Sequence, residues 1–174
     1  VENLSRRGFF GSLGSAGAGA AAAVAVAKPS WAMDGDVPST KLKGLGGDKL
    51  AALVKQDIEE RQFLVTGQLS RELYDEAATF TDEIDTYALE QWMRGTQKLF
   101  VGAQSHVDLV GDVAADEKEV SFRFSEVLAF NIPFRPKVNL TGKVVLKRGP
   151  DGLIESYREF WDQSVAEVLR TARI

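Results

Sequence analysis

The sequence predicts an α+β fold, with helices in the first half of the domain and antiparallel strands in the second. Apolar residues recur at helical spacing through residues 48–65 and 86–101, whereas between residues 105 and 161 they alternate with polar residues. The first pattern is typical of helices that bury one face, and the second is typical of strands that bury one face. Because the helices precede a series of strands, we expect the two kinds of element to pack as one α+β domain.

The first long helix is predicted over residues 48–65. Asp48 is placed to cap its start, and Gly67 is placed to end it. A short helix is predicted at residues 70–74 and a short strand at residues 77–81.

The second long helix is predicted over residues 86–101. The acidic run Thr81–Asp85 precedes it, so we expect Asp85 or Thr86 to cap its start and the negative charge to favour its N-terminus. The run lacks the glycine and the terminal bidentate Glu of a calcium-binding loop, so no calcium site is predicted there.

Strands are predicted in the remaining stretches of the chain. They are residues 105–113, 119–130, 137–147 and 153–161, followed by a short polar helix from Gln163. The turn-forming segment Arg148–Gly152 separates the last two strands.

Composition excludes several classes of function. Residues 33–174 carry 18 basic and 24 acidic side chains, a net charge of −6, which argues against a nucleic-acid partner. The chain has no cysteine, so disulfide and thiolate chemistry are excluded, and a single histidine, His106, argues against a histidine-built metal site. Strand alternation places His106 on the outward side. No metal or cofactor is predicted.

Residues 1–32 have the features of an export leader. The pair Arg6–Arg7 precedes the uncharged stretch Gly8–Ala27. The small residues Ser30 and Ala32 stand at the minus-three and minus-one positions of a possible cleavage site. Two outcomes are open: removal as a twin-arginine signal, or retention of Gly8–Ala27 as an apolar helix that anchors the protein in a membrane. The stretch is about long enough to cross a bilayer, and its small residues have the spacing of close helix contacts. Residues 33–47 are predicted to be a linker or extended arm.

The leader also predicts where the protein works. It resembles the second part of the two-step address of thylakoid-lumen proteins, in which a plastid transit peptide is removed first, and the chain begins with Val1. We therefore expect the chloroplast thylakoid lumen or the lumenal face of the thylakoid membrane. The bacterial periplasm is the alternative.

Two segments, Glu72–Asp82 and Gly152–Trp161, carry a family resemblance. Together with the order of the elements they resemble the nuclear-transport-factor-2-like superfamily, which includes the SnoaL-like proteins, over residues 48–162. The likeness is greatest to an uncharacterised branch in plastids and cyanobacteria. It implies a cone, in which a curved, mostly antiparallel sheet wraps around a long helix and leaves a pocket at the open end. It implies no single function, because this fold hosts isomerases, dehydratases, cyclases and binding modules.

The resemblance offers one catalytic candidate. In the ketosteroid-isomerase-like branch a general-base aspartate follows the short strand, and Asp82 matches that position. The same chemistry needs donors to an oxyanion. Ile58 stands where the family has its tyrosine, and Gly142 or Lys143 stands where it has an acid. The isomerase mechanism is therefore not predicted.

Several polar residues are predicted at inward positions and form the candidate ligand pocket. They are Asp57, Arg61, Tyr74, Asp82 and Glu126. A functional interpretation makes them the polar floor of the pocket, with Glu126 or Asp82 as a base. The structural interpretation, which we favour, makes Asp57 and Arg61 an ion pair at helical spacing and Glu126 a bulge or rim residue.

Three hypotheses about function follow. The first, which we favour, is a non-catalytic accessory, assembly or scaffold protein on the lumenal side of the thylakoid, such as a subunit of a photosynthetic membrane complex. It docks through the outer face of the sheet or through Gly8–Ala27, and its partner is a thylakoid membrane complex or a second copy of itself. The second is a protein that binds a small apolar ligand such as a pigment, a quinone or a lipid. The third is an isomerase- or dehydratase-type enzyme with a carboxylate base, for which Asp82 is the candidate.

Overall fold

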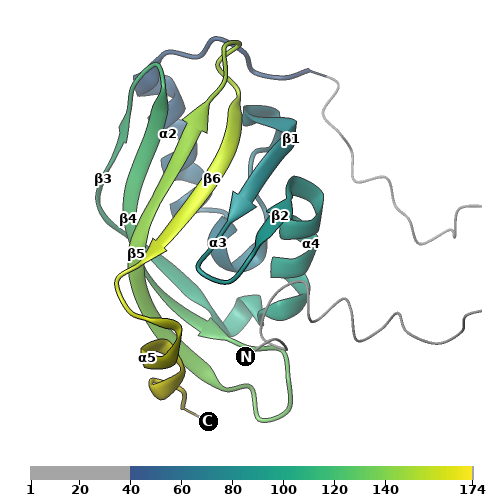
Figure 1. Ribbon diagram of the computed structural model, residues 1–174, viewed down its shortest axis with the longest axis vertical. Coiled ribbons are helices and arrows are strands. Elements are labelled where there is room, and N and C mark those ends of the chain that lie inside the picture. Colours follow the sequence, from purple (N-terminus) through teal and green to yellow (C-terminus); the bar gives the residue numbers. More distant parts are fainter. Residues whose placement is uncertain (1–39, 174) are drawn as a thin grey trace, which may run out of the picture.

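The computed structural model describes residues 40–173, which form one curved six-stranded sheet with helices packed against it (Figure 1). The strands lie in the order β2-β1-β6-β5-β4-β3. In this part of the chain the β1–β6 pairing is parallel and the other four pairings are antiparallel. The strands are β1 Tyr74–Thr81, β2 Thr86–Ala88, β3 His106–Ala115, β4 Glu119–Ala129, β5 Lys137–Arg148 and β6 Ile154–Trp161. The predicted α+β class is confirmed.

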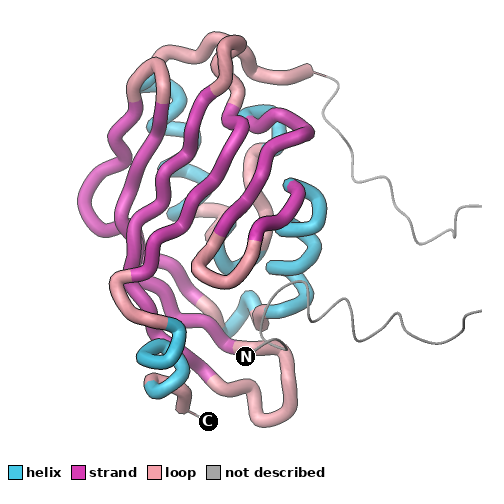
Figure 2. The backbone as a smooth tube through the Cα atoms, viewed as in Figure 1, coloured by secondary structure: helices cyan, strands magenta, loops and turns pink. Residues whose placement is uncertain are grey.

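The helices are short and lie mostly on one side of the sheet. They are α2 Gly47–Glu59, α3 Phe63–Thr66, α4 Leu89–Leu99 and α5 Val165–Arg170, with 3-10 turns η2 Arg71–Leu73 and η3 Gly102–Gln104. In Figure 1, α2 and α3 lie behind the strands and α5 lies at the lower end of the sheet. Figure 2 shows that the loops gather at the two ends of the strands, with the β4–β5 loop and α5 at the same end.

The first predicted helix, residues 48–65, is broken into α2 and α3. Between them Gln62 adopts the left-handed conformation, with φ 54°. Its side-chain amide donates to the carbonyl of Val107 and accepts from the Val107 N–H, which ties this corner to the edge of the sheet. Gly46 is the N-cap, and Asp48 lies in the first turn instead of capping the helix. The break is invisible in the sequence pattern because the residues of α3 remain buried.

The prediction of the second long helix, residues 86–101, is wrong for its first turn. Residues Thr86–Ala88 form β2, which pairs with β1, and α4 begins at Leu89. The carboxylate of Asp82 accepts the backbone N–H groups of Ile84 and Asp85 and so closes a hairpin turn. Aspartate side chains commonly hydrogen-bond the backbone two or three residues further on, so the acidic run forms a turn here and not a helix cap.

The curvature of the sheet has a local cause in β3. The pairing of β3 with β4 shifts register between Val110 and Ala114, and Gly111 in between has φ 78°. A bulge on one strand bends the pair and increases its twist. The pairing of β4 with β5 runs without a shift from Glu119 to Ala129, so the alternation of inward and outward side chains is kept along β4.

Aromatic rings fill the core between the concave face of the sheet and the helices. The rings in mutual contact are Phe63, Tyr74, Phe80, Trp92, Phe122 and Tyr157. Phe80 is central, with ring centroids 4.6 Å from Trp92 and 4.9 Å from Tyr157. Stacked and tilted pairs at such distances add to the free energy of burial.

A glycine in the middle of β5 gives the buried ring of Phe124 room. A Cβ at Gly142 would lie 2.3 Å from the carbonyl oxygen of Phe160 and 2.9 Å from Cζ of Phe124. The ring of Phe124 therefore lies across β5 where any other residue would place a side chain.

The other predicted elements agree with the structure. The four predicted strands are found as β3 to β6 with ends within two residues, and α5 begins after Ser164, which forms a capping box with Glu167. Within residues 40–173, no helix is long and apolar enough to cross a membrane. The leader predicted in residues 1–32 lies outside the described residues.

Candidate functional site

A buried carboxylate stands on the concave face of β6. Glu159 is only 4% exposed; the hydroxyl of Tyr157 donates to its Oε2, and the indole N–H of Trp161 donates to its Oε1 at 2.5 Å. The three residues are two apart along one strand, so their side chains lie on the same face of the sheet. Their hydrogen bonds fix the orientation of all three side chains.

The sequence analysis missed Glu159, although a signal for it exists. On β6 the buried Tyr157 and the half-buried Trp161 bracket Glu159 in the inward register. The same alternation that singled out Glu126 on β4 applies to Glu159 on β6. This alternation is the signal in the sequence that predicts a buried position for Glu159.

An apolar cavity lies beside Trp161 at the lower end of the sheet. Its volume is about 40 Å³, and it is lined by Ile84, Leu128, Phe130, Val138, Leu140, Trp161, Val165, Val168 and Leu169. Three of these residues belong to α5, which therefore covers one side of the cavity. Sites for small molecules usually measure about 300–1,000 Å³, so α5 has to move before a ligand of that size can enter.

Glu126 keeps the inward register predicted for it. It is 5% exposed, pairs with Leu140 on β5 and Val107 on β3, and lies between the buried Phe124 and Leu128. The alternative that a bulge turns it outward is wrong for the β4–β5 pairing, which has no register shift at this point. Glu126 and Glu159 are thus two buried carboxylates on the concave face.

Asp82 lies at the end of β1 and is 7% exposed. Its Oδ1 accepts the N–H of Ile84 at 2.8 Å and the N–H of Asp85 at 2.9 Å. This aspartate matches a general-base position in the isomerase branch that the sequence resembles, and here it has a structural role in the β1–β2 turn.

Asp57 and Arg61 form the ion pair that their helical spacing predicts, with Arg61 Nε 3.3 Å from Asp57 Oδ1. Asp57 also accepts the backbone N–H and the hydroxyl of Ser70, each at 2.8 Å, and so holds the entry to η2. Burial raises the pKa of the Asp57 carboxyl, against the lowering effects of Ser70 and Arg61. Burial also raises the pKa of the Tyr74 phenol well above its usual value, and the nearby charge of Asp57 adds to that rise.

The predicted site residues do not gather in one place. Asp57, Arg61 and Tyr74 are neighbours at one end of β1, and Asp82 follows the other end. The pairing of β1 with β6 shifts register between Tyr74 and Thr79, and the rings of Tyr74 and Phe80 are 5.6 Å apart, so β1 is not fully extended between these ends. Asp57 and Asp82 are bonded to different parts of the chain, Asp57 to Ser70 and Asp82 to the β1–β2 turn.

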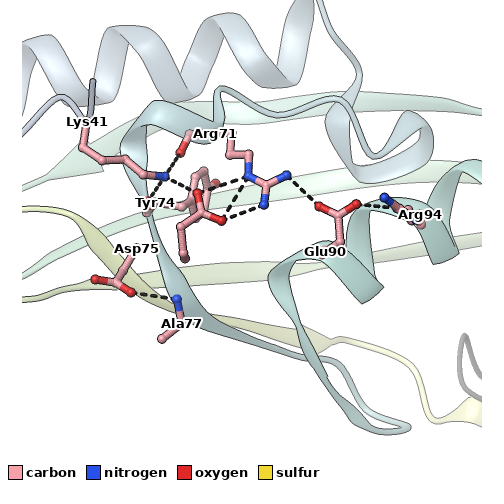
Figure 3. Close-up of polar contacts among 8 residues, drawn as sticks. Lys41, Arg71, Tyr74, Asp75, Ala77, Glu90 and Arg94 are labelled. Carbon is pink, nitrogen blue, oxygen red and sulfur yellow. Dashed lines mark hydrogen bonds and ion pairs between the residues drawn. The ribbon is translucent and has the colours of Figure 1, made fainter. Parts of the chain in front are cut away.

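A second polar cluster, which the sequence analysis also missed, fastens the arm to the domain (Figure 3). Lys41 Nζ donates to the backbone carbonyls of Arg71 and Tyr74 and to the carboxylate of Glu76. The guanidinium of Arg71 bonds both oxygens of Glu76 and also Glu90, at 2.6 Å. These bonds lower the pKa of Glu76 from 4.5 to about 2, with the hydrogen bond from Arg71 as the largest cause.

Further backbone bonds hold the rest of the arm, residues 40–46. The Leu42 N–H donates to the carbonyl of Glu72, and the Gly44 N–H donates to the carbonyl of Asp151. The guanidinium of Arg148 donates to the carbonyl of Leu45 at 2.6 Å. This segment is therefore part of the folded domain.

The only histidine lies away from these clusters. His106 Nε2 is 2.8 Å from the carboxylate of Asp108, and both side chains are exposed, as the strand alternation predicts. Among residues 40–173, no three histidine, aspartate or glutamate side chains come together in a way that would hold a metal ion.

No protein-family model matches the chain, and no curated protein matches it in sequence. Solved structures do match. SalBIII, an epoxide hydrolase/cyclase-like enzyme with a role in pyran ring formation in the polyether salinomycin, is 18% identical with a TM-score of 0.51 over 67% of this chain and 92% of its own. AclR, a proposed hydroxylase from Streptomyces galilaeus, is 14% identical with a TM-score of 0.53 over 72% of this chain and 97% of its own.

An NTF2-like protein from Anabaena variabilis is 20% identical, with a TM-score of 0.46 over 65% of this chain and 89% of its own. At these identities the matches to SalBIII and AclR show the fold alone. The chain has the α+β architecture with a curved, open, mixed sheet that the resemblance to the cone fold implied.

Proposed function

We propose that the chain is a non-catalytic accessory or assembly protein that docks to a membrane protein complex on the lumenal side of the thylakoid. One observation carries the proposal: the buried carboxylates of Asp57, Asp82 and Glu159 accept hydrogen bonds from groups of the protein itself. Asp82 closes a turn, Asp57 holds η2, and Glu159 is bonded by two aromatic side chains. A general base must instead present its oxygen to a substrate proton.

The outer face of the sheet offers a surface for a protein partner. A shallow hollow of about 300 Å³ lies there, lined by Thr81, Val145, Lys147, Ser156, Tyr157, Arg158 and Phe160. The guanidinium of Arg158 lies 5.2 Å from the ring centroid of Phe160, which is 45% exposed. Arginine and aromatic side chains carry much of the binding free energy at protein interfaces, so this pair is the proposed anchor of the contact.

The test compares the full chain with a Phe160→Ala variant, both extracted from native membranes in mild detergent. The unaltered protein is expected to sediment as part of a particle larger than its own dimer. Loss of an anchor of about 2 kcal/mol weakens binding roughly thirtyfold, so the variant should sediment free of the complex. Val110→Ala is the matched control, because Val110 is exposed on the distant strand β3. Finding the unaltered protein as a free monomer in the soluble fraction would contradict the proposal.

The same variant also tests whether the outer face binds a second copy of the chain. If the purified chain is a dimer and Phe160→Ala makes it monomeric, the outer face binds a second copy in place of a different protein. The sedimentation of the purified chain by itself distinguishes the two cases.

The proposed location rests on the pattern of residues 1–32 alone. The intact mass of the native protein tests it: a mass that begins at Met33 in the soluble fraction means a cleaved signal. A mass that includes Gly8–Ala27 in the membrane fraction means a retained anchor.

A second candidate function, binding of a small apolar ligand, is favoured by the apolar cavity under α5. We expect a pigment, quinone or lipid to occupy it only if α5 moves, given its volume of about 40 Å³. Native mass spectrometry of the protein isolated from its source tests this. A stoichiometric apolar ligand would put this function first, and a ligand-free protein would count against it.

The enzyme hypothesis has a direct test as well. If a specific activity were found and Asp82→Asn abolished it while the fold was kept, the non-catalytic proposal would fall.

A further inference from the structure

The loop between β4 and β5 lies at the lower end of the molecule (Figure 1), and two of its apolar side chains are exposed. We call residues 131–136 the tip. Its Phe134 is 79% exposed and its Ile132 is 39% exposed. Phe134 is the most exposed of the large hydrophobic side chains in residues 40–173. Exposed apolar groups that gather at one place mark an interaction surface more often than isolated ones do.

The backbone of the tip is built to hold Phe134 outward. The Arg135 N–H donates to the carbonyl of Ile132 at 3.0 Å, which closes a four-residue turn with Pro133 in second position. Phe134 is in third position with φ 67°, where glycine or asparagine is usual. An aromatic residue in this conformation costs free energy, and burial in the domain does not repay that cost. Strain of this kind is commonly kept where a side chain has a function.

The tip is firmly attached to the domain. The Asn131 N–H donates to the carbonyl of Leu99 at 2.8 Å, and its side-chain amide donates to the carbonyl of Lys98. The Phe130 N–H donates to the carbonyl of Pro136. These bonds attach the base of the loop to the end of α4 and close it at the end of β4.

The three segments beside the tip carry charge of the opposite sign to the chain as a whole. Three segments meet here: residues 98–104, 130–139 and 168–173, of which the last pairs with β5 through a Lys137–Arg173 bridge. They contain five basic residues and no acidic one, in a chain of net charge −4. The basic side chains are Lys98, Arg135, Lys137, Arg170 and Arg173, and all five residues are exposed.

We propose that the tip inserts into the headgroup region of a lipid bilayer that contains anionic lipid. Phe134 and Ile132 enter the boundary between headgroups and acyl chains, and the five basic side chains bind the anionic headgroups. A bilayer needs only a protruding apolar point with cations near it, and the segments that meet at the tip carry five exposed basic residues. A protein partner is less suited, because a narrow convex loop buries little area unless a matching groove receives it. The proposal is independent of the protein partner proposed for the outer face.

The test measures partitioning of the full chain onto vesicles by co-sedimentation. Vesicles of phosphatidylcholine with 30% phosphatidylglycerol are compared with vesicles of phosphatidylcholine alone, at about 50 and 300 mM salt. We expect binding to the anionic vesicles that weakens with salt. Phe134→Ser should lower the partition coefficient about tenfold. Arg135→Gln and Lys137→Gln should lower it about fivefold each.

The matched control is Val110→Ser, which removes an exposed apolar side chain from β3 and should leave partitioning unchanged. All chains carry the same residues 1–39, so any contribution of the leader cancels between variants. Equal partitioning of Phe134→Ser and the unaltered chain would overturn the proposal, as would binding that ignores lipid charge.

A second readout reports insertion at the tip itself. The chain has no cysteine, so Phe134→Cys and, as a control, Thr79→Cys each provide a single site for an environment-sensitive fluorophore. A blue shift on anionic vesicles is expected at position 134 and not at position 79. If neither position shifts, but Phe134→Ser releases the protein from a complex in detergent, the tip contacts a protein and the proposal is refuted. Because Phe160→Ala tests the outer face separately, failure of one proposal is distinguishable from failure of the other.

Discussion

Replacing Glu76 by Gln is expected to loosen the arm and to remove an acid-sensitive part of the stability. The hydrogen bonds from Arg71 and Lys41 hold the pKa of Glu76 at about 2, below its ordinary 4.5 (Figure 3). The folded state therefore favours the charged carboxylate. Its contribution is complete above pH 4.5 and is lost as the pH falls through about 2.

The magnitude follows from the shift and from the exposure. A fall from 4.5 to about 2 would be worth roughly 3.4 kcal/mol if it were fully realised, at about 1.36 kcal/mol per unit. The side chain of Glu76 is 37% exposed, so water and salt screen part of this interaction. Its partner Arg71 is 13% exposed, and its pKa is raised mainly by the hydrogen bond to Glu76. We therefore expect a loss of about 1–2 kcal/mol in the variant at pH 7.

Urea unfolding of the full chain and of Glu76→Gln, measured from pH 7 down to pH 2.5, tests this. The difference in unfolding free energy should be largest above pH 4.5 and should shrink steadily below it. Hydrogen exchange of the Leu42 amide, which bonds the carbonyl of Glu72, should be faster in the variant if the arm is released. Glu83→Gln, at an exposed position, is the control. A difference that does not change with pH, or an equal effect of the control, would refute the reasoning.

Three other substitutions test the roles given to buried positions. Gly142→Ala should lower the free energy of unfolding by about 2–4 kcal/mol, because the added Cβ would meet backbone at 2.3 Å; Gly102→Ala, with the nearest atom 3.9 Å away, should change it by less than about 0.5 kcal/mol in the same thermal melts. Asp57→Asn should show the pH trend opposite to that of the Glu76 variant: burial raises the pKa of Asp57, so its charged form is penalised above that pKa. The native chain should therefore gain stability relative to this variant as the pH falls from 7 toward 3.8, and a loss over that range would contradict the assignment. Asp82→Ala should cost about 1–2 kcal/mol and speed hydrogen exchange in the β1–β2 turn, whereas unchanged exchange would show that the turn does not depend on this carboxylate.

Much of the strand half of the domain was predictable, because alternation along a strand is a local property. Phe122, Phe124 and Glu126 all face inward as the pattern requires. The helical half was less predictable. The pattern could not show that Gln62 leaves the helix, since its hydrogen bonds reach Val107, 45 residues away. Nor could it show that Asp82 makes a hairpin turn, because acidic residues favour both turns and helix starts.

The candidate site was predicted in part. The Asp57–Arg61 pair follows from helical spacing alone and is present. The hydrogen bonds from Ser70 to Asp57 were not predictable, because Ser70 lies 13 residues further along the chain, beyond the end of the helix. Glu159 was missed, although strand alternation pointed to it.

The sequence by itself determined the α+β class, the four long strands and the outward position of His106, because the period of the apolar residues depends only on neighbours along the chain. The tertiary structure decided which polar groups meet. It bonded Asp57 to Ser70 and Asp82 to the β1–β2 turn, bound Lys41 to Glu76, and brought residues 98–104 and 168–173 beside the tip. The contacts of Lys41 and of the tip join residues tens of positions apart, and their existence depends on how the sheet curves and where its strands end.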